Sequence, residues 1–311
     1  MNQAFLSYFC TIFFCKTMTT PKNNILFIIN PISGGHNKAE IIKSISKILD
    51  ANRFNVSIVE TQYVGHAVEI AKKAVETRTD IVVAVGGDGT INEVASQLVN
   101  TNATFAIVPC GSGNGLARDL GISLNYKKAL QQINTLQTKK IDVGVCNHQY
   151  FFSLAGIGFD AKVAYDFNKG KKRKFFGYVK AIFKVFFFSK NQQFEIELAH
   201  EKITGNFFFV TIANGSQWGY NVKVAPKAKL DDGIFSVVLC KKPSILNIIP
   251  FGMKVLLGKI EQSVYVSLYS SNKITLHSKS DFYYHIDGDA KGISNQIVIE
   301  NLHKALNIIA N

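Results

Sequence analysis

Residues 80–93 read DIVVAVGGDGTINE, and this stretch decides the fold. Its apolar run is rich in β-branched residues and bounded by turn signals, so it predicts a short buried strand. The three glycines that follow permit a tight turn and let the backbone approach a ligand closely. Thr90 and Glu93 have the spacing of a capping box, so a helix is expected to begin at Thr90. The unpaired N–H groups and positive dipole end of such a helix predict a phosphate site.

Asp88 lies inside this glycine turn, where its carboxylate would repel a phosphate. A metal ion or a transferable proton between the two groups would remove the repulsion. A carboxylate beside a phosphate site therefore indicates a catalytic site. The alternative interpretation is an ordinary strand–turn–helix corner in which aspartate is a turn residue.

Strands alternate with helical patterns from residue 21 to residue 140. The other strands of this region are expected at 24–29, 56–59 and 104–108. This alternation predicts an α/β domain with a doubly wound, Rossmann-like parallel sheet. Glycine-rich turns follow three of its strands, at 30–35, 86–89 and 109–115. They are expected at the carboxyl edge of the sheet, where such sheets bind ligands.

Two familiar phosphate motifs do not fit these turns. The chain has no Gly-Lys-Ser/Thr ending after a glycine loop, so it has no Walker A loop. The glycines at 111–115 follow the fourth strand instead of the first, and no acid has the spacing of a dinucleotide fingerprint.

After residue 140 the pattern changes to short strands with few helices between them. They are expected at 141–145, 150–154, 194–198, 207–213, 234–240, 264–268, 273–277, 282–286 and 296–299. The sequence therefore predicts a mainly antiparallel β-sandwich domain over 141–300, and a segment over 301–311 that returns to the first domain. The cleft between the domains is expected to hold the site.

The cysteines and the amino terminus favour a cytoplasmic protein. The apolar residues within 1–17 lack the basic segment and cleavage site of a signal peptide, and Met18 opens a more natural beginning. Residues 1–20 are thus expected to be a leader that precedes the fold. No uninterrupted apolar run reaches the roughly 18 residues of a spanning helix. The cysteines show neither metal spacing nor close pairs, which favours a reducing compartment: Cys10, Cys15, Cys110, Cys146 and Cys240.

From about Lys22 to Asn311 the chain resembles the diacylglycerol kinase and sphingosine kinase family of lipid kinases, in its bacterial soluble form. The resemblance rests on an ordered set of motifs: GGDGT at 86–90, PxGSGN at 109–114, NPxSG at 30–34, GIGFDA at 156–161, AP at 225–226, LDDG at 230–233 and IDGD at 286–289. The GGDGT motif alone is also shared with NAD kinases.

The resemblance implies transfer of the γ-phosphate of ATP to a lipid hydroxyl, with Mg²⁺ neutralising the charge that develops. It places the nucleotide against the glycine turns and nearby polar side chains. The expected nucleotide-binding residues are Asn30, Pro31, Ser33, Gly34, Thr61, Gly86, Gly87, Asp88, Gly89, Thr90, Asn92, Gly111, Ser112, Gly113 and Asn114.

Asp289 matches the family position of the carboxylate that acts as base toward the substrate hydroxyl. Bacterial diacylglycerol kinases usually carry Glu there. The side chain of Asp289 is shorter, so for proton transfer the base or the substrate must lie closer by about one methylene. Asp88 is the competing candidate for base, as in sphingosine kinases. We assign the base to Asp289 and place Asp88 at the nucleotide and metal.

Other acids are implied in metal and substrate binding. Asp232 matches a family position that holds a structural Mg²⁺ with two backbone carbonyls, here those of Lys229 and Ile234. A hairpin turn is the alternative interpretation of Asp232. Asp142 and Asp160 fall where the family carries acids that face the cleft and bind substrate, and strand-end capping is the alternative for both.

Phe167–Lys190 combines positive charge with aromatic residues. The chain carries 35 Lys and Arg against 22 Asp and Glu, a net charge of +13, and this segment holds seven Lys, one Arg, seven Phe and no acid. A helix here could lie on an anionic bilayer, so binding to anionic vesicles is expected to depend on its Lys and Arg residues. The alternative is that the phenylalanines pack onto the β domain. Nucleic-acid binding has no further support in the sequence.

The sequence thus predicts an ATP- and Mg²⁺-dependent kinase that phosphorylates diacylglycerol or a sphingoid-type lipid. We expect a cytoplasmic protein that meets its substrate peripherally at an anionic membrane surface, with a homodimer as one possible assembly. The alternatives are a NAD kinase, and a non-catalytic lipid or nucleotide sensor on the same scaffold. The shortened Asp289 is the one hint of a sensor.

Overall fold

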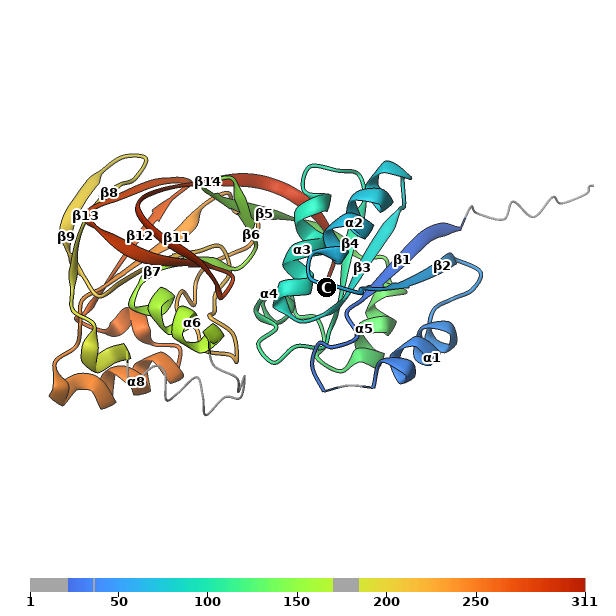
Figure 1. The fold of residues 1–311 in the computed structure, drawn as a ribbon, viewed down its shortest axis with the longest axis horizontal. Coiled ribbons are helices and arrows are strands. Elements are labelled where there is room, and N and C mark those ends of the chain that lie inside the picture. The colour runs from blue at the N-terminus through green and yellow to red at the C-terminus, as the bar shows by residue number, and fades with distance from the viewer. Residues whose placement is uncertain (1–21, 36, 170–184, 311) are drawn as a thin grey trace, which may run out of the picture.

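The computed structural model describes residues 22–35, 37–169 and 185–310, which form two domains side by side (Figure 1). The expectations for the leader, and for the Lys-rich part of Phe167–Lys190, lie outside the described residues. Within the described ranges, every helix is too short or too polar to span a bilayer.

The amino-terminal domain is a parallel sheet with helices on both faces. Its strands are β1 (Asn23–Ile29), β2 (Phe54–Glu60), β3 (Ile81–Gly86) and β4 (Thr104–Pro109). Its helices are α1 (Lys38–Ile48), α2 (His66–Glu76), α3 (Asp88–Leu98), α4 (Gly115–Asp119) and α5 (Tyr126–Ile133). The strands lie in the order β4-β3-β1-β2 and all pair in parallel. The predicted doubly wound sheet is confirmed.

Burial on both faces explains why β3 is apolar at every position. Val82 and Ala84 belong to the core that α2 and α3 cover, whereas Val83 and Val85 belong to the core that α1 and α5 cover. All four side chains are fully buried. A strand covered on both faces has no polar side, as parallel sheets require.

The carboxyl-terminal domain is a mainly antiparallel β-sandwich, as predicted. Its strands are β5 (Thr138–Cys146), β6 (Gln149–Phe151), β7 (Leu154–Gly158), β8 (Gln192–Glu197), β9 (Lys202–Phe207), β10 (Phe209–Ala213), β11 (Phe235–Cys240), β12 (Val266–Ser271), β13 (Lys273–Ile286) and β14 (Asp289–Ile309). Its helices are α6 (Phe159–Lys169), the 3₁₀ turns η1 (Ile245–Asn247) and η2 (Ile260–Gln262), and α8 (Ile248–Leu256).

Several elements of this domain differ from the sequence prediction: β7, β9 and α6 were not expected, and β14 is far longer than the strand expected at 296–299. The strands expected at 273–277 and 282–286 are one strand, β13, whose ladder with β14 is irregular between His277 and Phe282. Helix α8 was not predicted. It accommodates Pro250 in its first turn, where a missing backbone N–H costs no helical hydrogen bond.

Strand β14 connects the two domains. It pairs with β13 and β5 in the sandwich, and Ile308 near its end pairs in parallel with Phe105 of β4. Its ladder with β5 is interrupted between Leu302 and Leu306, where Lys304 has a φ of 51°. The sheet is therefore continuous from one domain to the other.

Candidate active site

The three glycine turns meet at the carboxyl edge of the parallel sheet. A Cβ added to Gly34 would lie 1.7 Å from the carbonyl oxygen of Cys110, and one added to Gly87 would lie 3.2 Å from the Cα of Gly111. The first and second turns therefore both pack directly on the third. Glycine is required at these positions because the backbones touch, and at Gly34 also because its φ is +61°.

Beside this packed centre, the second turn presents an open helix end. Helix α3 follows Gly87, which offers no side-chain cap, and of the first N–H groups of the helix that of Asp88 bonds the Asp88 carboxylate itself. A Cβ added to Gly89, in the first turn of α3, would meet nothing within 4 Å. An uncapped helix N-terminus that is open to approach suits the phosphates of a nucleotide.

The Asp88 carboxylate points toward the third turn instead of the open helix end. Its two oxygens accept hydrogen bonds of 2.9 Å from the backbone N–H groups of Asn114 and Gly115. Burial raises the pKa of Asp88, and these two hydrogen bonds oppose the rise. Asp88 thus joins the second turn to the third. Because both oxygens are already bonded, its geometry favours a structural role over that of a base.

Helix α3 begins at Asp88, two residues before the predicted start, and the expected capping box does not form. The Thr90 hydroxyl instead accepts a hydrogen bond of 2.9 Å from the Asn30 side chain. Glu93 accepts a hydrogen bond from the backbone N–H of Gly65. Thr90 and Glu93 thus bond to residues of other loops instead of forming the capping box with each other.

Several predicted nucleotide-binding side chains shape the turns themselves. Asn30 also accepts a hydrogen bond from the N–H of Ile32, and its carbonyl accepts one from the Ser33 hydroxyl. The Asn114 side chain is buried and exchanges two hydrogen bonds with the backbone of Gly111. These residues hold the backbone in place. Other members of the predicted set lie at exposed or half-exposed positions of the same edge: Pro31, Thr61 and Ser112.

Two basic residues that the sequence reasoning missed also bond to the turns. The Nζ of Lys38, which is 8% exposed, donates to the carbonyl of Ser33 over 2.5 Å. The Nε of Arg118 donates to the carbonyl of Gly113 over 2.9 Å. Both stand within five residues after a glycine turn, which is the signal that could have identified them. Their charge suits a polyanionic ligand.

Asp289 is held opposite the turns by a tight hairpin. It pairs with Ile286 across the two-residue turn Asp287-Gly288, whose φ values of 48° and 84° are those of a type I′ turn. The Asp287 carboxylate accepts hydrogen bonds of 2.8–3.0 Å from three successive backbone N–H groups, those of Phe152, Ser153 and Leu154. The turn that precedes Asp289 is thereby fixed.

Asp289 itself is exposed. Burial is the main cause of the raised pKa of Asp88 and Glu93, and the charge of Asp289 raises both further. A carboxylate of the second domain therefore lies within electrostatic reach of the second glycine turn. This is the arrangement expected of a base opposite a bound phosphate.

Asn92 was predicted at the nucleotide, but its amide is bonded elsewhere. Its Nδ2 donates to Asp287 over 3.0 Å and to the carbonyl of Tyr150 over 3.3 Å. The structure instead gives Asn92 the task of joining α3 to the Asp289 hairpin.

Asp160 lies behind the Asp289 hairpin, at the start of α6. One of its oxygens accepts a hydrogen bond of 2.9 Å from Thr211 and lies 3.5 Å from the Nε2 of His285. The Nδ1 of His285 accepts the N–H of Gly288 over 3.2 Å. His285 is 3% exposed. Asp160 thus supports the hairpin through His285, a residue that the sequence reasoning did not identify.

The prediction that Asp142 faces the cleft is wrong. Asp142 is completely buried, and its carboxylate accepts hydrogen bonds of 2.6–2.8 Å from Gly233, His303 and Lys304. Its partners on β14 lie more than 160 residues further along the chain, so local sequence could not indicate them. Asp142 holds the interruption of β14 in place.

The predicted metal residues form an exposed turn. Lys229, Asp232 and Ile234 are all exposed, and an Asp232 oxygen accepts the N–H of Ile234 over 3.3 Å. Among the described residues, no three His, Cys, Asp or Glu side chains gather as metal ligands. A site here would combine one carboxylate with two carbonyls. Those hard oxygens suit Mg²⁺, and the site stays a prediction.

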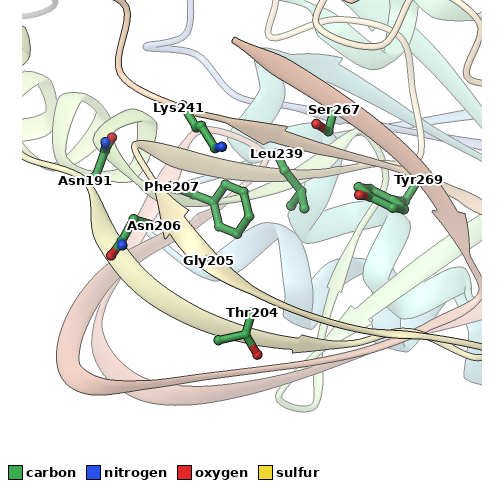
Figure 2. Close-up of a pocket in the computed structure, with 9 residues that line it drawn as sticks. All are labelled: Asn191, Thr204, Gly205, Asn206, Phe207, Leu239, Lys241, Ser267 and Tyr269. Atoms are coloured by element: carbon green, nitrogen blue, oxygen red, sulfur yellow. The ribbon is translucent and has the colours of Figure 1, made fainter. Parts of the chain in front are cut away.

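A separate hollow of about 420 Å³ lies on the far part of the β domain (Figure 2). It is bounded by β9, β11 and β12, and the partners of these three strands all belong to the sandwich. Lys241 is its one charged lining residue. The hollow therefore lacks the acids and glycine turns on which phosphoryl transfer depends.

Two family profiles together match nearly the whole described chain. The diacylglycerol kinase catalytic domain matches residues 24–146, and the YegS C-terminal NAD kinase beta sandwich-like domain matches residues 153–310. The first profile also covers β5 (Thr138–Cys146), which pairs with β14 and β6 in the structure, and the second profile begins just before β7.

Individual proteins are similar over the same length. A diacylglycerol kinase of Bacillus subtilis strain 168 is 27% identical over 91% of this chain and 94% of its own. One of Staphylococcus aureus strain MRSA252 is 28% identical over 85% of each chain. A crystal structure of a putative diacylglycerol kinase from Bacillus anthracis str. Sterne shares the fold, with a TM-score of 0.77, 23% identity and coverage of 94% and 98%. The chain is thus a kinase that belongs to the diacylglycerol kinase family.

Proposed function

We propose that the protein transfers the γ-phosphate of ATP to a hydroxyl group of a membrane lipid, either diacylglycerol or a sphingoid-type lipid. The observation that carries the proposal is Asp289, an exposed carboxylate of the second domain whose charge acts on Asp88 at the start of α3. Phosphoryl transfer needs an anion site and a facing base, and this arrangement supplies both. The names of the relatives favour diacylglycerol.

In this proposal the three turns hold the phosphates of ATP through backbone N–H groups, and Lys38 and Arg118 add positive charge beside them. Asp289 orients the lipid hydroxyl and accepts its proton. Mg²⁺, when bound, neutralises charge on the phosphates during transfer. The second domain contributes the base, so both domains are required for turnover.

The test is incubation with Mg²⁺ and ATP labelled at the γ-phosphate, with diacylglycerol, a sphingoid base and NAD as separate acceptors. We expect label in a lipid product. Label in NAD would overturn the proposal in favour of a NAD kinase, and label in no acceptor would favour a sensor. Asp289→Asn serves as the inactive control.

A further inference from the structure

Helix α8 is apolar on two opposite faces. Phe251 and Val255 pack inward on a buried cluster of the β domain. Ile249, Met253 and Leu256 follow the spacing of a second helical face and point outward, with exposed fractions of 78%, 51% and 65%. A helix that is apolar all round is normally buried on all sides. The outer face of α8 is therefore an unpartnered surface.

The exposed face continues beyond the helix. Ile245, Leu246 and Leu257 flank it and are 74%, 90% and 63% exposed. We call these three residues, with the three on the outer face of α8, the α8 patch. Six contiguous exposed side chains of this size are more than scattered surface residues, and such patches mark interaction sites.

Two exposed aromatic residues lie at the same end of the domain. Phe187 and Phe188 are 58% and 78% exposed, and the adjacent Phe186 packs on the same buried cluster as α8. Figure 1 shows residues 185–188 close to α8, on the side of the β domain that also carries α6. The apolar surface thus draws on two segments separated by about sixty residues of sequence.

The charged residues nearest to α8 along the chain are lysines, and the acid that follows them, Glu261, is ion-paired with Lys227 over 3.1 Å. Residues 241–260, which contain α8, carry Lys241, Lys242, Lys254 and Lys259 and no Asp or Glu. Lys242 also lies 4.9 Å from the ring of Phe186, so it borders both segments. An apolar face with basic residues at its border is the arrangement that binds an anionic bilayer surface.

We propose that the α8 patch docks this protein on the surface of an anionic membrane. The inference rests on the proposed function, because a lipid acceptor resides in a bilayer. A second copy of the chain is a less favourable partner for the α8 patch than a membrane. A two-fold dimer places the same patch on both sides of the interface, so it would bring four lysines against four lysines. Anionic lipid headgroups instead attract all of them.

The experiment is co-sedimentation with vesicles of phosphatidylcholine and phosphatidylglycerol in equal parts, and with vesicles of phosphatidylcholine alone. Ile249→Asp with Met253→Asp is the patch variant. Val56→Asp with Ile58→Asp is the matched control, because these exposed residues lie on β2 of the other domain. Circular dichroism and thermal unfolding establish that each variant is folded.

We expect the patch variant to bind anionic vesicles at least tenfold more weakly than the wild type, and the control to bind as the wild type does. Lys241→Gln with Lys259→Gln should lower binding to anionic vesicles by about fivefold per lysine and leave weak binding to neutral vesicles unchanged. Equal vesicle binding by patch variant and wild type overturns the proposal. So does a wild-type dimer that the patch variant converts to monomer without loss of vesicle binding.

Kinase assays separate this proposal from the proposed function. With the lipid acceptor dispersed in detergent micelles, the patch variant should phosphorylate it as the wild type does. A wild type that binds vesicles but labels no acceptor contradicts the proposed function alone. A patch variant that binds vesicles normally, beside a wild type that labels lipid, contradicts the docking alone.

Discussion

Asn92 donates a hydrogen bond of 3.0 Å to Asp287, from a helix of the first domain to a hairpin of the second. The first of these residues stands four positions after Asp88, and the other stands two positions before Asp289. The bond therefore joins the helix that begins at the anion site to the turn that carries the proposed base. In the proposed reaction, this bond would help to set the distance between the phosphate and the acceptor.

Replacing Asn92 with Ala should impair turnover more than folding. Asp287 keeps its three backbone hydrogen bonds, so the free energy of unfolding should fall by about 1 kcal/mol. Loss of the link should lower kcat by about 10-fold to 100-fold, because small misplacements of a base are costly. Urea unfolding and steady-state kinetics measure the two effects. Gln97→Ala, at a half-exposed position of the same helix, is the control, and an Asn92→Ala variant with normal kcat would contradict the positioning role.

Asp289→Asn should reduce kcat by about 10²-fold to 10⁴-fold and leave ATP binding nearly intact, since an amide cannot accept the proton of the lipid hydroxyl. Asp289→Glu keeps the carboxylate and should retain turnover. Kinetics and nucleotide titration of the two variants test the assignment. Normal turnover in Asp289→Asn would move the base to Asp88.

Gly34→Ala should destabilise the protein by about 2–4 kcal/mol. The new Cβ would meet the carbonyl oxygen of Cys110 on a backbone with φ of +61°, so steric overlap adds to conformational strain. Gly35→Ala is the matched control, because its Cβ would meet nothing within 4 Å and should change stability by less than about 0.5 kcal/mol. Urea unfolding compares the two, and equal stabilities would show that the first and third turns are not in contact.

The buried thiols should be unreactive in the folded protein. Burial raises the pKa of Cys146 to about 12, so at pH 8 only about one molecule in ten thousand carries the thiolate that attacks alkylating reagents. Burial also raises the pKa of Cys110 and Cys240. In a Cys10→Ser, Cys15→Ser background, iodoacetamide should label these three residues only after unfolding. Rapid labelling of native protein, followed by mass spectrometry, would contradict the burial.

The strand pattern predicted the meeting of the glycine turns, because parallel strands bring their carboxyl ends to one edge. It could not predict how Asn92 and Asp142 are used, since their partners lie 195 and more than 160 residues away. Helix α8 was missed for another reason. With apolar residues on every side, its sequence has no polar face to reveal the helical period, and nothing in it distinguishes a buried face from an exposed one.

The length of β14 has a mechanical consequence. Because the strand is hydrogen-bonded into the sandwich and, near its end, to β4, neither domain can swing about a loose linker. Bending of β14 would be concentrated where its ladder with β5 is interrupted. There the Asp142 carboxylate accepts hydrogen bonds from His303 and Lys304. Any opening of the two domains would therefore have to bend the strand at the point where a buried acid, remote in sequence, holds it.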